Sequence, residues 1–73
     1  MTLRDIMEQI TIQGNVVIKR FEDDGETEIT IMESYDFECD RHKLTDDTLD
    51  RTVQYIYPVS QDMYMSFVCI ELE

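Results

Sequence analysis

VVIKRFEDDGETEITIM, at residues 16–32, is the stretch of sequence that decides the fold. Its two ends, Val16 to Phe21 and Thr27 to Met32, are rich in the β-branched residues that favour strands. Asp23-Asp24-Gly25 lies between them, and this combination is typical of a tight turn. The stretch therefore predicts a β-hairpin.

The register of this hairpin depends on the turn that joins its strands. We expect a type I turn over Glu22–Gly25, with the glycine in the left-handed region and a bulge after it. That register places Arg20 opposite Glu28, which is a favourable pair of opposite charges. A two-residue Asp24-Gly25 loop is the alternative, and it would place Phe21 opposite Glu28 instead.

The N-terminus predicts a short helix. Thr2 can cap it, and Asp5 follows at the spacing of a capping box. The apolar residues then recur at helical spacing, at Leu3, Ile6, Met7 and Ile10. We expect the helix to end at Gln13-Gly14-Asn15, because glycine tolerates the positive φ of a helix end.

Two further segments follow the hairpin. Between Tyr35 and Asp40 apolar and acidic residues alternate, which indicates a strand at a sheet edge or an extension of the second strand. Thr45 to Asp50 combines a cap with acids of a first turn, so we expect a single helical turn there. One longer helix over Thr45–Tyr57 is the alternative, although its β-branched and aromatic end is a poor helix former.

The C-terminal third predicts two strands. Thr52 to Tyr57 has strand composition, and Pro58 to Asp62 is expected to form the turn that follows. Met63 to Leu72 is apolar on both faces, which is typical of a central strand.

Together these elements predict one α+β domain over residues 1–73. We expect the N-terminal helix to pack on one face of a three- or four-stranded antiparallel sheet, with one short second helix. The other face of the sheet would stay open, as is common for antiparallel sheets.

Composition narrows the possible functions. The 73 residues include six Lys and Arg against seventeen Asp and Glu, for a formal net charge of −11. Such a charge repels nucleic acid and anionic membranes, so we expect no direct binding to either. No apolar run approaches the length of a bilayer span, and the first residues lack the zones of a signal peptide. Two cysteines are too few for a disulfide framework, so we expect a cytoplasmic protein with reduced thiols.

Enzymatic and metal-binding motifs are missing from the sequence. Cys39 and His42 could pair as nucleophile and base, but no third group near them would orient the histidine. With Cys69 they make at most three soft ligands, and a structural zinc site needs four. The acids around Gly25 lack the spacing of a calcium loop. We therefore expect no catalytic residues, no metal and no cofactor, and keep a metal-responsive module as a third hypothesis.

The distribution of the acidic residues is the strongest functional signal. Twelve acids and two bases lie between Glu22 and Asp50, a net charge of −10 over 29 residues. Aromatic residues are interleaved with them, so charge could steer a basic protein and the rings could anchor it. The leading hypothesis is a non-enzymatic inhibitor that mimics nucleic acid and blocks a basic groove; the simpler interpretation is a solvated acidic face. The expected contact residues are Asp23, Asp24, Glu26, Tyr35, Asp36, Phe37, Glu38 and Asp40.

A second hypothesis is an accessory or structural protein that self-associates as a homodimer. The contact would be the open sheet face or the last strand. Its expected residues are Tyr55, Tyr57, Met63 and Met65.

Several short segments support a resemblance to a known group of proteins. The opening pattern of Leu3-Arg4-Asp5-Ile6, Ile12-x-Gly14 and Val16-Val17-Ile18 before an acidic turn resembles short acidic proteins of mobile elements, phage or conjugative, in Gram-positive bacteria. Val53-x-Tyr55-Ile56-Tyr57 fits the same group. Some of these proteins are anti-CRISPR inhibitors that occupy the DNA-binding groove of a nuclease. The resemblance implies such an inhibitor, and it assigns no functional positions.

Overall fold

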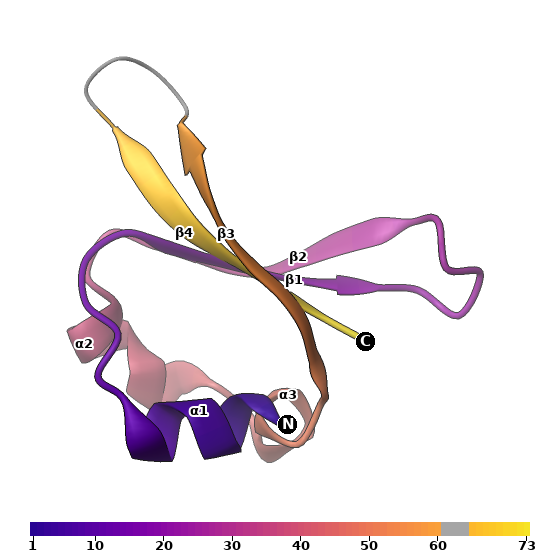
Figure 1. Cartoon of the computed structure of the whole chain (residues 1–73), viewed down its shortest axis with the longest axis horizontal. Coiled ribbons are helices and arrows are strands. Elements are labelled where there is room, and N and C mark those ends of the chain that lie inside the picture. Colours follow the sequence, from indigo (N-terminus) through magenta and orange to yellow (C-terminus); the bar gives the residue numbers. More distant parts are fainter. Residues whose placement is uncertain (61–64) are drawn as a thin grey trace.

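The computed structural model describes residues 1–60 and 65–73. They form one four-stranded sheet with short helices (Figure 1). In chain order the elements are α1 (Leu3–Gln9), β1 (Val16–Phe21), β2 (Glu28–Ser34), α2 (Phe37–Asp40), the 3₁₀ turn η1 (Arg41–Lys43), α3 (Asp46–Leu49), β3 (Val53–Ser60) and β4 (Ser66–Leu72).

The sheet is mixed, so the prediction of an antiparallel sheet is wrong. Its strand order is β2-β1-β4-β3, and the two central strands β1 and β4 run parallel, with Val16 beside Val68 and Arg20 beside Leu72. The other two pairings are antiparallel. The reason is the crossover: after β2 the chain passes through the helices to the far edge of the sheet, and β4 then returns beside β1. The central position predicted for the last strand is confirmed.

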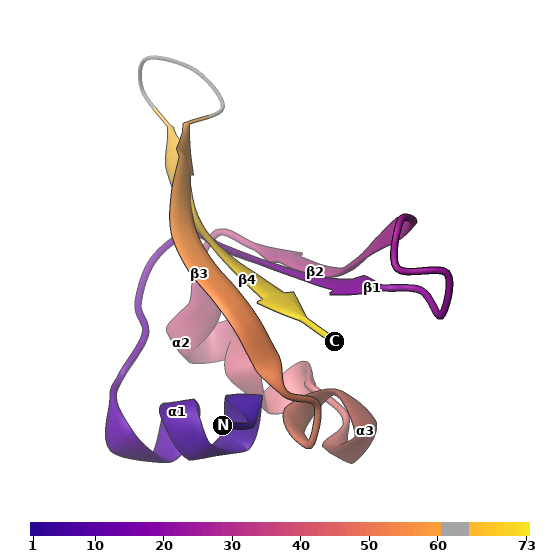
Figure 2. The same cartoon turned by 45° about the vertical axis from the view of Figure 1, so that its right-hand side comes forward.

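The helices lie together on one face of the sheet, and the core fills the space between (Figure 2). Side chains that alternate along the central strands point into this core. The predicted α+β class is confirmed, although the single second helix is in fact α2, η1 and α3. The fully buried core residues are Leu3, Val16, Ile18, Phe37, Ile70 and Leu72.

The N-terminal helix is shorter than the sequence predicted. Thr2 and Asp5 form the expected capping box: the Asp5 N–H donates to Thr2 Oγ1 at 3.2 Å, and the Thr2 N–H donates to Asp5 Oδ2 at 3.1 Å. The helix ends at Gln9 rather than near Gly14, and Ile10 is exposed. Gly14 does have the positive φ predicted for it, 84°.

The hairpin forms with the predicted turn but with a different register. The Gly25 N–H donates to Glu22 O at 2.9 Å, and Gly25 has a φ of 74°. Phe21 lies opposite Glu28 and Arg20 opposite Ile29, so the preferred pairing of Arg20 with Glu28 is wrong. The pairing of Phe21 with Glu28 is the one expected for the alternative loop, and it results because the loop closes between Glu22 and Thr27, where the Glu22 N–H donates to Thr27 O at 2.8 Å. A second register shift lies between Ile18 and Lys19 of β1.

The segment from Tyr35 to Asp40 is not a strand. The chain turns there, because the Phe37 N–H donates to Gly14 O at 3.0 Å and the short helix α2 begins. The apolar alternation in this segment is not a strand pattern, since Phe37 is its one core residue and Tyr35 and Cys39 are exposed.

The remaining predictions are largely confirmed. Thr45 caps the single helical turn α3, whose Thr48 N–H donates to Thr45 Oγ1, so the longer alternative helix is wrong. β3 begins at Val53, one residue after the predicted start at Thr52, and continues through Pro58 to Ser60, where a turn was predicted. Pro58 is tolerated there because β3 is an edge strand. The rest of that turn and the predicted start of the last strand, residues 61–64, lie outside the described residues.

Candidate protein-interaction surface

The hairpin tip is an acidic turn held by hydrogen bonds to the Asp24 carboxylate. Asp24 Oδ1 accepts the N–H groups of Glu26 and Thr27, both at 2.9 Å, and Asp24 Oδ2 accepts the Thr27 hydroxyl at 2.8 Å. The bond from Thr27, followed by that from Glu26, lowers the pKa of Asp24 below its ordinary value. Asp24 therefore shapes the turn and stays ionised.

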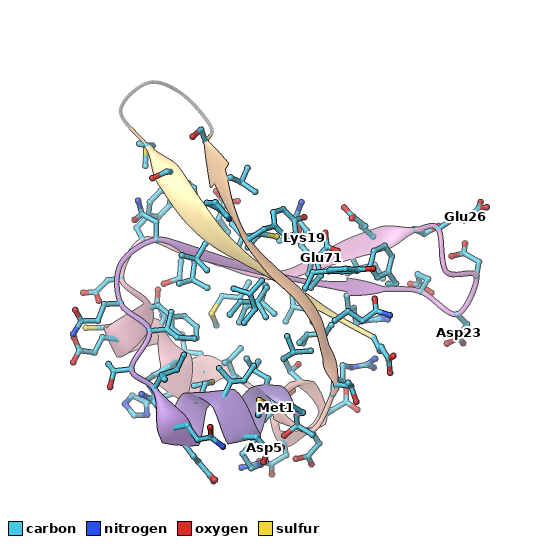
Figure 3. All side chains as sticks on the ribbon, viewed as in Figure 1. Met1, Asp5, Lys19, Asp23, Glu26 and Glu71 are labelled. Atoms are coloured by element: carbon cyan, nitrogen blue, oxygen red, sulfur yellow. The ribbon has the colours of Figure 1, made fainter. Side chains whose placement is uncertain are left out.

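Two further acids, Asp23 and Glu26, flank Asp24 and Gly25 at the hairpin tip. Asp23 and Glu26 are exposed and lie at the far end of the β1–β2 hairpin, away from the helices (Figure 3). No salt bridge reaches either carboxylate from any residue that the structure describes. The tip thus presents two free charges beside the one that Asp24 uses for the turn.

The second predicted acidic group lies where β2 meets α2. The Ser34 hydroxyl donates to Asp40 Oδ2 at 2.7 Å and accepts the Asp36 N–H at 3.2 Å. The Ser34 bond, with Lys43 Nζ at 3.0 Å from Asp40 Oδ1, lowers the pKa of Asp40. Asp40 is therefore a structural residue with its own cation, whereas Asp36 and Glu38 are exposed.

The two predicted aromatic anchors have different positions. Tyr35 is exposed, with its ring edge-on to Phe67 at 5.5 Å and its hydroxyl donating to Glu33 at 3.3 Å. Phe37 has only 1% of its surface exposed and belongs to the core. The structure therefore corrects the expected role of Phe37. Its ring packs α2 against the sheet and is too deeply buried to contact a partner.

The predicted contact residues form two groups rather than one cluster. The hairpin tip and α2 lie at opposite ends of β2, as Figures 1 and 2 both show. The exposed side chains of Glu28 and Glu33 on β2 connect them. We call this row the acidic edge, and it consists of Asp23, Asp24, Glu26, Glu28, Glu33, Asp36 and Glu38.

Basic side chains neutralise the acids elsewhere more completely than on this edge. Arg4 binds both Asp46 and Asp50 at 3.1 Å, and Arg51 binds Asp47 at 3.3 Å. On the acidic edge only Glu28 has a cation, Lys19 Nζ at 3.7 Å, among the residues described. The unneutralised charge is thus concentrated along β2 and its two ends.

Sequence reasoning missed the polar and aromatic groups on the open sheet face. Phe67, Cys69 and Glu71 alternate along β4 on the face opposite the core, and all three are buried. The Tyr57 hydroxyl donates to Glu71, and this bond raises the pKa of Tyr57. The alternation of these residues with Val68, Ile70 and Leu72 was visible in the sequence, but a carboxylate among them gave no sign of being buried.

A shallow pocket of about 240 Å³ lies on this open face, between the two hairpins. Its lining includes Val17, Phe67 and Cys69 from the central strands, together with Lys19 and Glu33. The pocket borders the acidic edge at Glu33. It mixes one positive and one negative side chain, so it has no strong preference for a charged ligand.

The two thiols and the histidine lie in three different elements. Cys39 lies exposed in α2, His42 in η1, and Cys69 is buried in β4. A bond to Asp36 is the main reason that the pKa of Cys39 is raised, so its thiol stays protonated at neutral pH. Within residues 1–60 and 65–73 no three His, Cys, Asp or Glu side chains gather in a way that could hold a metal ion.

Comparisons of the chain with known proteins give no match. No family model, no curated protein and no solved structure matches the chain. Among the described residues, no helix has the length and apolar character needed to span a membrane.

Proposed function

We propose that this chain is a non-enzymatic inhibitor whose acidic edge binds a basic groove of a nucleic-acid-binding protein. One observation carries the proposal: the acids of the acidic edge are left almost without cations, whereas those around α3 pair with Arg4 and Arg51. Leaving like charges close together costs stability through repulsion. A cationic partner would relieve that repulsion on binding.

The extended geometry of β2 supports mimicry of a nucleic-acid backbone. Alternate side chains along a strand are separated by about 7 Å and point to the same face. Carboxylates on such a strand and at its two ends make a row of negative charge, which is what a groove built for phosphates accepts. The row is longer than a single loop could provide.

Tyr35 is the aromatic anchor that this proposal retains. Its ring is exposed at the α2 end of the acidic edge and already contacts Phe67. A ring held in this way loses little conformational freedom on binding, and tyrosine is common at the centre of interfaces. Charge would therefore steer the encounter, and Tyr35 would slow dissociation.

The partner class follows from the same chemistry. A groove lined with Lys and Arg occurs in proteins that bind nucleic acid, and a nuclease of the CRISPR type is one example. The net charge of −11 argues against direct binding to nucleic acid itself. The inhibitor would act by competition for the groove.

To test the proposal, the partner is captured on the chain, and its displacement by nucleic acid is then measured. Protein from the native cell is bound to the immobilised chain at low salt, and a DNA duplex or rising salt is used for elution. We expect Glu26→Lys to weaken binding of the captured protein about tenfold, because it reverses a free charge of the tip. Glu8→Lys is the matched control, since Glu8 is also exposed but lies on α1, and we expect less than about a twofold change.

Two outcomes would contradict the proposal. Capture that DNA cannot displace would exclude competition for a nucleic-acid groove. Equal losses in Glu26→Lys and Glu8→Lys would show that total charge matters and the acidic edge does not.

A further inference from the structure

The outer edge of β3 carries no charged side chain. Its sequence from Val53 to Ser60 is VQYIYPVS, whereas the other edge strand, β2, presents Glu28 and Glu33. Exposed edge strands have unpaired backbone groups, and charged residues normally keep other strands from adding to them. β2 has that protection and β3 does not.

The exposed apolar side chains of the described residues are concentrated on the same strand. Three of six exposed large hydrophobic residues are consecutive there: Tyr55 at 60% exposure, Ile56 at 49% and Tyr57 at 36%. The two tyrosines are on the open face, with Ile56 on the helix face between them, because side chains alternate along a strand. An added strand would thus find apolar side chains on both faces.

One end of this outer edge already pairs with extended chain. Thr2 forms an antiparallel bridge with Thr52, and the Val53 N–H donates to Met1 O at 2.9 Å. Beyond that point, no described strand pairs with β3 on the side away from β4. The pairing along Tyr55–Tyr57 is therefore open for another strand.

We propose that β3 pairs antiparallel with β3 of a second copy of this chain. A register irregularity between Val53 and Tyr55 limits the regular edge on one side, and Pro58, which has no N–H, limits it on the other. The regular window is Tyr55–Tyr57. Its centre is Ile56, so the two-fold axis passes there and each Ile56 faces its counterpart.

A second copy fits this edge because Tyr55-Ile56-Tyr57 is palindromic: with Ile56 facing Ile56, Tyr55 of each copy lies opposite Tyr57 of the other. Two chains of net charge −11 repel each other, but β3 itself contributes no carboxylate to the contact; the nearest acids, Glu22, Asp23 and Glu73, line a groove with Tyr55 at one end of it. β2 and β3 are opposite edges of the sheet, so β2 of each copy, with Glu28 and Glu33, stays at an outer end of an eight-stranded sheet. A cationic partner would instead be drawn to β2.

The interface formed by Tyr55–Tyr57 of the two copies is small, so we expect a low affinity. Three residues per copy with their backbone bonds bury less than a standard interface, and we expect dissociation constants between about 1 μM and 1 mM. The proposal uses an edge that the proposed function leaves free, so either can fail without the other. If both hold, one dimer presents two acidic edges.

Sedimentation equilibrium over a range of protein and salt concentrations tests the pairing. We expect the mass to rise from 8.7 kDa toward twice that value, and the association to strengthen with salt, which screens the repulsion. Binding of a basic partner through the acidic edge should instead weaken as salt rises, because salt screens the attraction. Ile56→Lys should weaken the dimer at least tenfold. Ile10→Lys, at the similarly exposed C-cap residue of α1, should change it less than twofold.

A cross-link tests the register without relying on the lysine variant. Residues that face each other in an antiparallel pair have Cα atoms about 4.5–5.5 Å apart, within the range that a disulfide spans. Mild oxidation of Ile56→Cys in a Cys39→Ser background should give a covalent dimer more than tenfold faster than Ile10→Cys. A wild-type chain that stays monomeric near 1 mM at every salt concentration, or equal cross-linking of both variants, would overturn the proposal.

Discussion

The two edge strands of the sheet differ in the side chains that they present to solvent. β2 carries exposed glutamates and continues at both ends into further acids, whereas β3 exposes tyrosines and an isoleucine and no charge. Charge on an edge both repels other strands and attracts a cationic partner. One small sheet can therefore separate two kinds of contact, because its two edges are on opposite sides of the central pair β1 and β4.

The two edges also differ in how deeply their apolar side chains are buried. Phe37 at the end of the acidic edge is buried, and Ile56 of β3 is half exposed. Phe37→Ala should lower the free energy of unfolding by about 3–5 kcal/mol, because it removes a core ring and leaves a cavity. In urea denaturation of the monomer, Ile56→Ala should cost only about 1 kcal/mol or less.

If Phe37→Ala lowers the free energy of unfolding by much less than this, the Phe37 ring lies outside the core. In that case Phe37 would return to the set of partner contacts, as the sequence alone indicated.

Sequence patterns predicted much of the fold because several signals were local. The capping box of Thr2 and Asp5, the turn at Gly25 and the cap at Thr45 each depend on residues a few positions apart. β4 was recognised as central because apolar residues occupy both of its faces. Such signals need no knowledge of the rest of the chain.

The errors arose where distant residues decide the structure. The bond from the Phe37 N–H to Gly14 O starts α2 across more than twenty residues of chain, and no local pattern indicates it. The parallel pairing of β1 with β4 depends likewise on the path of the crossover. The acidic run was evident from composition, but its division between the two ends of β2 and its neutralisation by Arg4 and Arg51 required the fold.

A smaller expected effect is the pH dependence of stability that Asp24 gives to the hairpin tip. Hydrogen bonds from Thr27 and Glu26 hold the pKa of Asp24 below its ordinary value of 3.8. Folding therefore favours the ionised form, so this contribution to stability is complete well above the ordinary pKa of 3.8 and is lost as the pH falls through the lower pKa of the folded state. Asp24→Asn keeps an oxygen acceptor but removes the charge.

We expect thermal unfolding to separate wild type from Asp24→Asn at pH 6 and to bring their melting temperatures together at about pH 2. Asp23→Asn is the control, since its side chain has no bond within the described residues and its replacement should not follow this pH dependence. A difference that stays constant down to pH 2 would mean that the turn does not depend on the Asp24 charge.

The central claim is that unneutralised charge is concentrated on the acidic edge. This claim can be tested without knowing the partner. A short oligolysine peptide added to the ¹⁵N-labelled chain reports by amide chemical shifts which residues a flexible cation contacts. The account predicts shifts at residues 23–38, few at the arginine-paired acids of 46–50, and almost none along β3. Shifts of equal size at 46–50 would contradict it.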